Sequence, residues 1–186
     1  NNAEMVILQL ACIRGGAIFM PLNWRLAVKE LEGLIGDAGP VVLFAQSAFS
    51  PPDNAPRTID IADMLSLGEE DATPPVDARR PFDAVSTLLY TSGTSGRPKG
   101  VMLSEQNNFW GCTNLIHGNA VNPSSTFLCD MPLFHTAGLM AAARTPLLAG
   151  GAVLISEGFD PELTLQRMRD PDLGVTHYFS VPQMAA

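Results

Sequence analysis

The stretch from Tyr90 to Gly100 reads Y-T-S-G-T-S-G-R-P-K-G and concentrates groups that bind phosphate. It holds three glycines and four serine or threonine side chains. Glycine lets the backbone approach a ligand closely, and successive backbone N–H groups in such a turn form a concave site for anions, to which hydroxyls add donors. Lys99 adds a compact positive charge. The composition predicts a loop that cradles a phosphate chain.

Two known glycine motifs do not account for this stretch. The Walker A loop requires G-x-x-x-x-G-K-[ST], and counting from Gly93 places Pro98 where the second glycine belongs. The pattern G-x-G-x-x-G does not fit either. A polar hairpin between two strands is the ordinary role of a Ser/Thr/Gly loop. The density of donors, with Lys99 three residues beyond Gly96, favours phosphate binding over that ordinary role.

A second stretch, from Asp130 to Leu139, reads D-M-P-L-F-H-T-A-G-L and follows a run expected to form a strand. His135 stands beside Phe134 at the end of that strand. A single histidine in such a place is more often a packed, hydrogen-bonded structural residue than a catalytic one. The residues alone therefore leave the role of His135 open.

Both stretches resemble motifs of the adenylate-forming (acyl-CoA synthetase, AMP-binding) superfamily. The family loop reads Y-T-S-G-T-T-G-x-P-K-G, and this chain departs from it only at Ser95, where a hydroxyl is retained. The segment P-L-F-H-T-A-G-L is similar to P-[LM]-F-H-x-x-G-[LF], which borders the carboxylate and acyl pocket in acyl-CoA synthetases. The resemblance implies that the ATP phosphates are bound by Thr91, Ser92, Gly93, Thr94, Ser95, Gly96 and Lys99, and that the acid is bordered by His135 and Gly138.

The resemblance also implies a reaction in two halves. A carboxylic acid, fatty or aromatic, attacks the α-phosphate of ATP and gives an acyl-adenylate and pyrophosphate, after which the thiol of coenzyme A displaces AMP. ATP, Mg²⁺ and coenzyme A are the expected cofactors. Amino-acid-activating domains usually carry aspartate at the position of His135, so histidine disfavours an α-amino acid substrate. Two alternatives stay open: an adenylation domain that loads a carrier protein, and a nucleotide-binding module without catalysis.

The resemblance covers residues 1–186, interpreted as an incomplete N-terminal AMP-binding domain from which the C-terminal domain is absent. The family's magnesium-ligating glutamate and catalytic lysine lie downstream, so this chain is assigned no catalytic residue and no metal ligand. Charged residues make up 16% of the chain, against roughly 25% in an ordinary soluble domain, which suggests that the core continues beyond it. We expect this piece by itself to be inactive and to self-associate as a homo-oligomer.

Charge and cysteine content limit the other possibilities. The net charge is −8 and no basic cluster is present, which argues against a nucleic-acid partner. No apolar run approaches the ~20 residues of a membrane span. Cys12, Cys112 and Cys129 are odd in number and lie in apolar surroundings, so we interpret them as buried free thiols of a cytoplasmic protein.

The elements that must position these residues indicate an α/β fold with a mostly parallel sheet and covering helices. Asn2, Ser104 and Asp160 are expected helix caps, and Leu163 and Met168 are expected to face inward. A strand, a helix and a strand between residues 17 and 44 predict a parallel crossover. Residues 46–83 are rich in proline and are interpreted as a loop region. Strands are expected at residues 17–20, 41–44, 58–61, 85–89, 126–129, 152–155 and 175–179, and a helix perturbed by Pro146 at 139–149.

Overall fold

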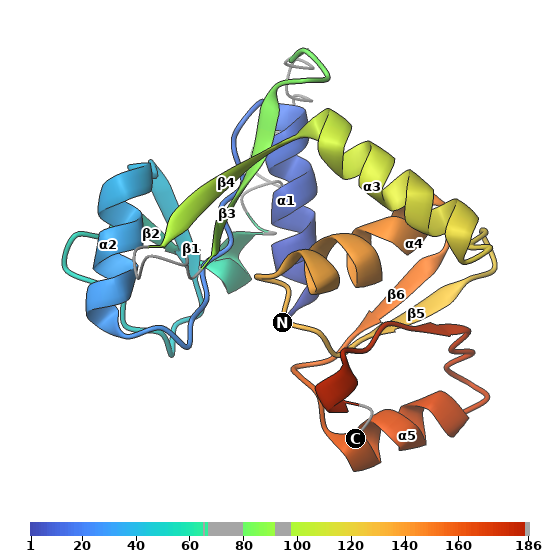
Figure 1. Cartoon of the computed structure of the whole chain (residues 1–186). Coiled ribbons are helices and arrows are strands. Elements are labelled where there is room, and N and C mark those ends of the chain that lie inside the picture. The colour runs from blue at the N-terminus through green and yellow to red at the C-terminus, as the bar shows by residue number, and fades with distance from the viewer. Residues whose placement is uncertain (65, 67–79, 92–97, 185–186) are drawn as a thin grey trace.

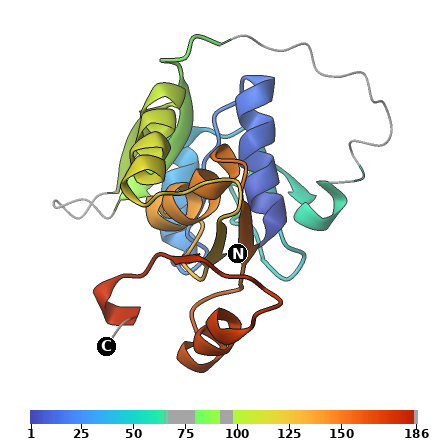
Figure 2. The ribbon, with the colours of Figure 1, turned by 90° about the vertical axis from the view of Figure 1, so that its right-hand side faces the viewer.

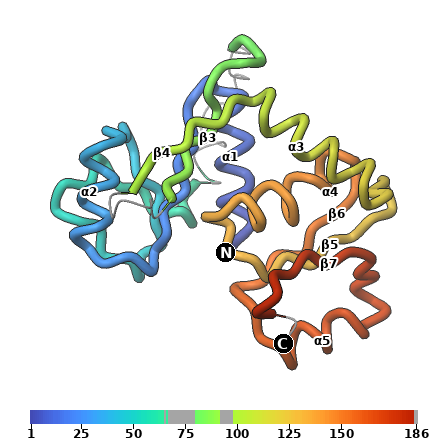
Figure 3. Tube along the Cα trace, in the orientation of Figure 1, coloured from blue at the N-terminus to red at the C-terminus, as the bar shows by residue number. Residues whose placement is uncertain are grey.

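The computed structural model describes residues 1–64, 66, 80–91 and 98–184. Their strands form three small sheets, as Figure 1 shows. β1 (Val42–Ala45) pairs in parallel with β2 (Arg57–Asp60), and β3 (Val85–Thr91) pairs antiparallel with β4 (Lys99–Ser104). The third sheet is parallel, in the order β6-β5-β7; β7 lies beside β5 in Figure 3. Its strands are β5 (Thr126–Cys129), β6 (Ala152–Ile155) and β7 (His177–Tyr178).

Helices cover these strands, and the predicted α/β architecture is confirmed. α1 (Ala3–Gly15) and α3 (Glu105–Gly118) flank the central segment of η3 (Ala137–Arg144) and α4 (Thr145–Leu148), whereas α2 (Val28–Ala38) packs beside β1 and β2 (Figure 1). Figures 1 and 2 both show α5 (Pro161–Arg169) at one end of the molecule, below β5 and β6. In the described part of the chain no helix is long and apolar enough to cross a membrane. The remaining elements are η1 (Ile61–Met64) and η4 (Pro182–Met184).

Three helices begin at the predicted caps. The backbone N–H of Met5 donates to the Asn2 side chain at 3.1 Å, and that of Asn107 donates to Ser104 Oγ at 3.1 Å. Asp160 accepts from the N–H of Leu163 at 2.9 Å. Each side chain satisfies one of the N–H groups that the first helical turn leaves without an internal partner.

The strand expected at residues 17–20 is reduced to one bridge. Phe19, which is 5% exposed, pairs in parallel with Thr87; its N–H donates to the carbonyl of Ser86 at 2.9 Å, and its carbonyl accepts from the N–H of Leu88 at 2.9 Å. Pro21 has no N–H to extend a ladder. The predicted crossover within one sheet is therefore wrong, because this segment joins β3 whereas β1 joins β2.

Two other local predictions need correction. Leu163 in α5 is 46% exposed, and the inward position belongs to Thr164, which is 3% exposed and donates to a buried carboxylate. The helix expected around Pro146 is a π-helix, η3, followed by one short turn, α4. Proline lacks the N–H and crowds the preceding turn, and the wider π turn accommodates it.

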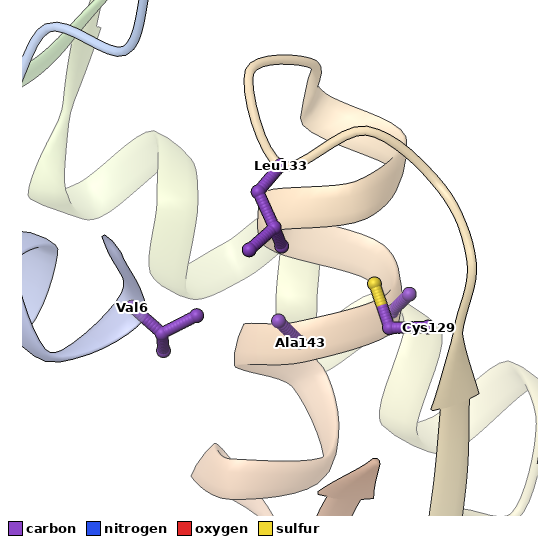
Figure 4. Packing of buried hydrophobic residues seen from close by; sticks show 5 residues of the cluster. Val6, Cys129, Leu133 and Ala143 are labelled. Carbon is purple, nitrogen blue, oxygen red and sulfur yellow. The ribbon is translucent and has the colours of Figure 1, made fainter. Parts of the chain in front are cut away.

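Buried side chains hold the helices against the third sheet. One cluster joins Val6 of α1 to Cys129 at the end of β5 and Ala143 of η3, with Leu133 between them (Figure 4). All three cysteines are free, with Cys112 and Cys129 buried and Cys12 half-buried. Burial raises the pKa of each thiol, to about 11 for Cys129. The prediction of a buried free thiol is confirmed for Cys112 and Cys129, whereas Cys12 is only partly covered.

Candidate functional site

The β3–β4 hairpin carries the two ends of the predicted phosphate loop. Thr91, the last residue of β3, is paired with Lys99, the first residue of β4, and both are exposed. Side chains directly opposite in an antiparallel pair have Cβ atoms about 4.5–5.5 Å apart. The two side chains therefore leave the backbone next to each other at the mouth of the loop. The other predicted phosphate-binding residues, Ser92, Gly93, Thr94, Ser95 and Gly96, lie outside the described residues.

Tyr90 ties this hairpin to α2. Its hydroxyl donates to Asp37 Oδ2 at 2.6 Å. Burial, with the hydrogen bond and charge of Asp37, raises the pKa of Tyr90 to about 12. Gly100 stands opposite Tyr90, and a Cβ at that position would lie 3.4 Å from the tyrosine ring and 3.1 Å from the Leu88 side chain. The aromatic residue of the motif thus has a structural function, which is to fix the hairpin next to the loop.

His135 projects from an anchored turn between β5 and η3. Its N–H donates to the Pro132 carbonyl at 3.1 Å, and its carbonyl accepts from the N–H of Leu139 at 2.9 Å. The side chain is exposed, and its ring lies 4.7 Å from that of the buried Phe134. A fixed backbone with an exposed ring suits contact with a ligand, which is the role predicted for His135.

Asn1 and Leu133 anchor the same turn. The Asn1 amide nitrogen donates to the Met131 carbonyl at 2.8 Å, and the Leu133 N–H donates to Asn1 Oδ1 at 2.9 Å. Leu133 is fully buried. An asparagine side chain that satisfies both a carbonyl and an N–H holds this irregular segment as a strand partner would. Sequence reasoning missed it, because the two segments are far apart along the chain.

Gly138 has a packing reason to be glycine. A Cβ there would lie 2.3 Å from the Pro132 carbonyl oxygen and 2.8 Å from that of Met131. These atoms are backbone, so they cannot swing aside. The first turn of η3 therefore packs directly on the segment before His135, and this contact sets the course of that segment. The predicted role of Gly138 at the acid pocket stays a prediction.

Asp130 is a buried carboxylate that sequence reasoning also missed. Its side chain is fully buried and accepts from the hydroxyls of Ser156, Thr164 and Tyr178, the last at 3.3 Å, while Arg167 Nη1 lies 3.8 Å away. Burial, followed by the charge and hydrogen bond of Asp130, raises the pKa of Tyr178 to about 12. Asp130 thus joins β5, β6, α5 and β7 at the carboxyl end of the parallel sheet.

The structure brings one further cation to the His135 turn. The guanidinium of Arg25 lies 5.2 Å from the Trp24 ring and 5.9 Å from the Phe134 ring, distances at which a cation is attracted to an aromatic face. A basic residue directly after tryptophan was the signal for this contact.

His177 belongs to the scaffold. Its ring stacks on Phe127 at 4.6 Å with an angle of 3°, and its nitrogens lie 2.8 Å from Thr176 Oγ1 and 3.1 Å from the Asn119 carbonyl oxygen. The ring thereby joins β7 to β5 and to the end of α3. This arrangement gives His177 a structural role.

Two hollows on the described surface lie away from the predicted site residues. One, of about 440 Å³, is lined by α1 and the start of β3, and one, of about 540 Å³, lies beside α5.

Within residues 1–64, 66, 80–91 and 98–184, no three His, Cys, Asp or Glu side chains gather in a way that would hold a metal ion. The described site therefore offers an exposed hydroxyl, an ammonium and an imidazole, which suit contact with anions.

Comparison with known proteins adds a family match over the whole chain. Residues 1–186 match the family described as AMP-binding enzyme. A feruloyl-CoA synthase of Amycolatopsis sp is 37% identical over 190 residues, covering 99% of this chain and 37% of that protein. An indoleacetate–CoA ligase of Aromatoleum aromaticum is 34% identical over 193 residues, covering 95% of this chain and 38% of that protein. The chain thus spans well under half the length of these relatives.

A solved structure extends the similarity to the backbone. The o-succinylbenzoate CoA synthetase of Bacillus subtilis, in complex with an acyl-adenylate intermediate, superposes with a TM-score of 0.86 at 28% identity, covering 100% of this chain and 48% of that chain. The same synthetase is also known in complex with ATP and a magnesium ion.

Proposed function

The chain belongs to the AMP-binding enzyme family, and from that premise we propose that it is part of the N-terminal domain of an acid–thiol ligase. The enzyme would activate an aromatic carboxylic acid with ATP and transfer the acyl group to coenzyme A. The observation that carries this proposal is the match of nearly the whole chain to CoA ligases such as feruloyl-CoA synthase and indoleacetate–CoA ligase.

The chemistry gives the phosphate loop its role. A carboxylate is a poor acyl donor, and adenylation gives it a good leaving group. In the step that forms the adenylate, negative charge accumulates on the departing pyrophosphate. Donors already in place around that charge lower the barrier. We assign this role to Lys99 and Thr91, together with Ser92, Gly93, Thr94, Ser95 and Gly96. Magnesium would accompany ATP and offset phosphate charge, and no residue of this chain is assigned to it.

His135 and Gly138 are proposed to border the acid. The exposed imidazole of His135 would donate a hydrogen bond to the substrate carboxylate, and the close packing of Gly138 on residues 131 and 132 fixes the backbone of the turn that carries it. The names of the relatives favour an aryl acid over a fatty acid. The exposed aromatic ring of Trp24 near Phe134 is consistent with an aromatic substrate.

ATP–pyrophosphate exchange by the full-length protein that contains this chain tests the proposal. The acids would be ferulate, indoleacetate, o-succinylbenzoate, a long-chain fatty acid and an α-amino acid. We expect exchange with at least one aryl acid and none with the amino acid. Exchange with the fatty acid alone would overturn the proposed substrate class, and no exchange with any acid, despite ATP binding, would favour the non-catalytic module.

The acceptor is tested separately. Purified acyl-adenylate on the enzyme is mixed with coenzyme A or with a phosphopantetheine-bearing carrier protein, and the thioester is measured. We expect transfer to coenzyme A. Transfer to the carrier protein alone would show that the protein is a carrier-loading adenylation domain and not a CoA ligase. The free thiols support a reducing compartment, and we propose the cytoplasm.

A further inference from the structure

We propose that the partly buried ion pair between Glu105 and Arg144 is a positioning pair. It would fix the β3–β4 hairpin, which carries the ends of the phosphate loop, relative to residues 131–138, which are proposed to border the acid. The inference rests on the proposed function, because it concerns the adenylation step. Glu105 is the first residue of α3 and directly follows β4, whereas Arg144 is the last residue of η3. The pair therefore joins the two elements that carry the predicted ATP and acid contacts.

The pair is partly shielded from solvent, and Glu105 also lines the hollow of about 440 Å³. The Arg144 side chain is 8% exposed and that of Glu105 is 20% exposed, and Arg144 Nη2 donates to Glu105 Oε1. The other carboxylate oxygen, Oε2, accepts from the hydroxyl of Ser86 in β3 at 3.2 Å. In a low-dielectric setting, each charge fixes the position of its partner much more strongly than it would in water.

A short polar chain extends the pair into β3. The Asn108 amide donates to Ser86 Oγ at 3.1 Å and to Thr87 Oγ1 at 3.2 Å. Ser86, Thr87 and Asn108 are all buried. β3 runs from these residues directly to Thr91, so the network fixes the strand that delivers the phosphate loop.

On the Arg144 side, η3 connects the pair to the turn that carries His135. The first turn of η3 packs through Gly138 on the backbone of residues 131 and 132, and Leu139 N–H donates to the His135 carbonyl. Arg144 fixes the last turn of the same helix to the first residue of α3, and α3 lies above the η3–α4 segment in Figure 1. A shift of η3 relative to α3 would therefore move His135 relative to Lys99.

Stability alone does not account for the choice of charges here. Among the described residues, Arg144 Nη1 is buried without a hydrogen-bond partner, so part of its desolvation is uncompensated. An apolar pair of similar volume is often as stable as a buried ion pair or more so, whereas removing one partner alone is strongly destabilising. An ion pair fixes the relative position of the two elements that it joins more strictly than an apolar contact does. A reaction between two bound substrates depends on the relative position of the groups that hold them.

The test uses the full-length protein, once its exchange activity is established. The double variant Glu105→Leu/Arg144→Met removes both charges and keeps comparable volume, and Glu105→Gln removes one charge and keeps the hydrogen-bonding shape. Arg169→Met, an exposed position at the end of α5, is the matched control. Each variant is measured for Tm, for ATP binding, and for kcat and KM with ATP and with the acid in pyrophosphate exchange.

We expect the double variant to keep its Tm within a few degrees and its ATP affinity, and to lose roughly 10–100-fold in exchange kcat, since misplacement by about 1 Å can cost 100-fold. The control should match the wild type. Wild-type kcat in a folded double variant would overturn the inference. If the double variant does not fold, Glu105→Gln decides: a loss in kcat with an unchanged Tm supports positioning, and an unchanged kcat or loss of the fold overturns it. Absence of exchange in the wild-type protein would instead refute the proposed function.

Discussion

Thr91 and Lys99 stand directly opposite each other at the open end of the β3–β4 hairpin, both exposed. This places the Cβ atoms of a threonine and a lysine next to each other where the loop leaves one strand and returns to the other. In the sequence these residues are separated by the whole loop. A hairpin is the ordinary role of a Ser/Thr/Gly loop, and that role is compatible with the proposed phosphate binding, because the hairpin pairs two of the residues proposed to bind phosphate.

Lys99→Ala in the full-length protein should slow pyrophosphate exchange by about 100-fold or more, the loss seen when one preorganised donor is removed from a developing negative charge. Its Tm should change little, because the side chain is exposed. Lys29→Ala, an exposed lysine in α2, is the control for loss of charge. An unchanged exchange rate in Lys99→Ala would remove this lysine from the phosphate site.

His135→Ala should change the ranking of acids while ATP affinity stays nearly intact. The imidazole is exposed and its turn is held by backbone contacts, so the fold does not depend on the ring. KM for each acid, the ATP dissociation constant and Tm are the measurements, with the exposed His117→Ala as control. A lower Tm, together with an equal rise in KM for every acid, would show that His135 has a structural role instead.

Gly138→Ala should destabilise the fold by about 1–3 kcal/mol, the usual cost of overpacking, because the new methyl would meet backbone oxygen at 2.3 Å. Gly111→Ala in α3 is a matched control with the opposite sign. A Cβ at Gly111 meets nothing within 4 Å, and alanine is favoured over glycine within a helix by about 0.8–1.0 kcal/mol. Denaturant unfolding measures both, and equal stability of the two variants would contradict the packing argument.

Tyr90 and Tyr178 should ionise near pH 12, above the ordinary value of 10. Because the pKa of each tyrosine is higher in the folded state than in the unfolded state, the protonated hydroxyl stabilises the folded protein below pH 10. That stabilisation is lost as the pH rises from 10 to 12. Tyrosinate absorbance is measured against pH for the wild type, Tyr90→Phe and Tyr178→Phe. The difference between the wild type and each variant gives the titration of the tyrosine that was replaced. Asp37→Asn should lower the pKa of Tyr90 and leave Tyr178 unchanged. Ionisation of both near pH 10 would contradict the two tyrosine–carboxylate contacts.

The chain as an isolated protein should self-associate and form no acyl-adenylate. Several large apolar side chains are exposed, among them Val41 at 88%, Met102 at 70% and Trp24 at 60%. Such surfaces favour association, and phosphate contacts exposed to water and salt bind weakly. Light scattering and a pyrophosphate-release assay measure the two parts. A monomer that releases pyrophosphate in the presence of an acid would contradict both.

The sequence by itself determined the local features of this protein. The caps Asn2, Ser104 and Asp160 and the β6 strand depend on neighbouring residues, so their types and spacing suffice. The motif also identified the family, because eleven consecutive positions constrain one backbone and its chemistry. None of these predictions depends on which segments pack together in the folded protein.

Tertiary structure alone decided the contacts between distant segments. Nothing near Leu163 in the sequence shows that Thr164 takes the inward position, because that choice is made by Asp130 on another element. The Glu105–Arg144 pair joins residues 39 positions apart, and its burial depends on how α3 packs against η3. The one-residue bridge of Phe19 likewise follows from its partner in β3. Burial and the partners of buried polar groups are properties of the assembled chain, so local sequence patterns do not determine them.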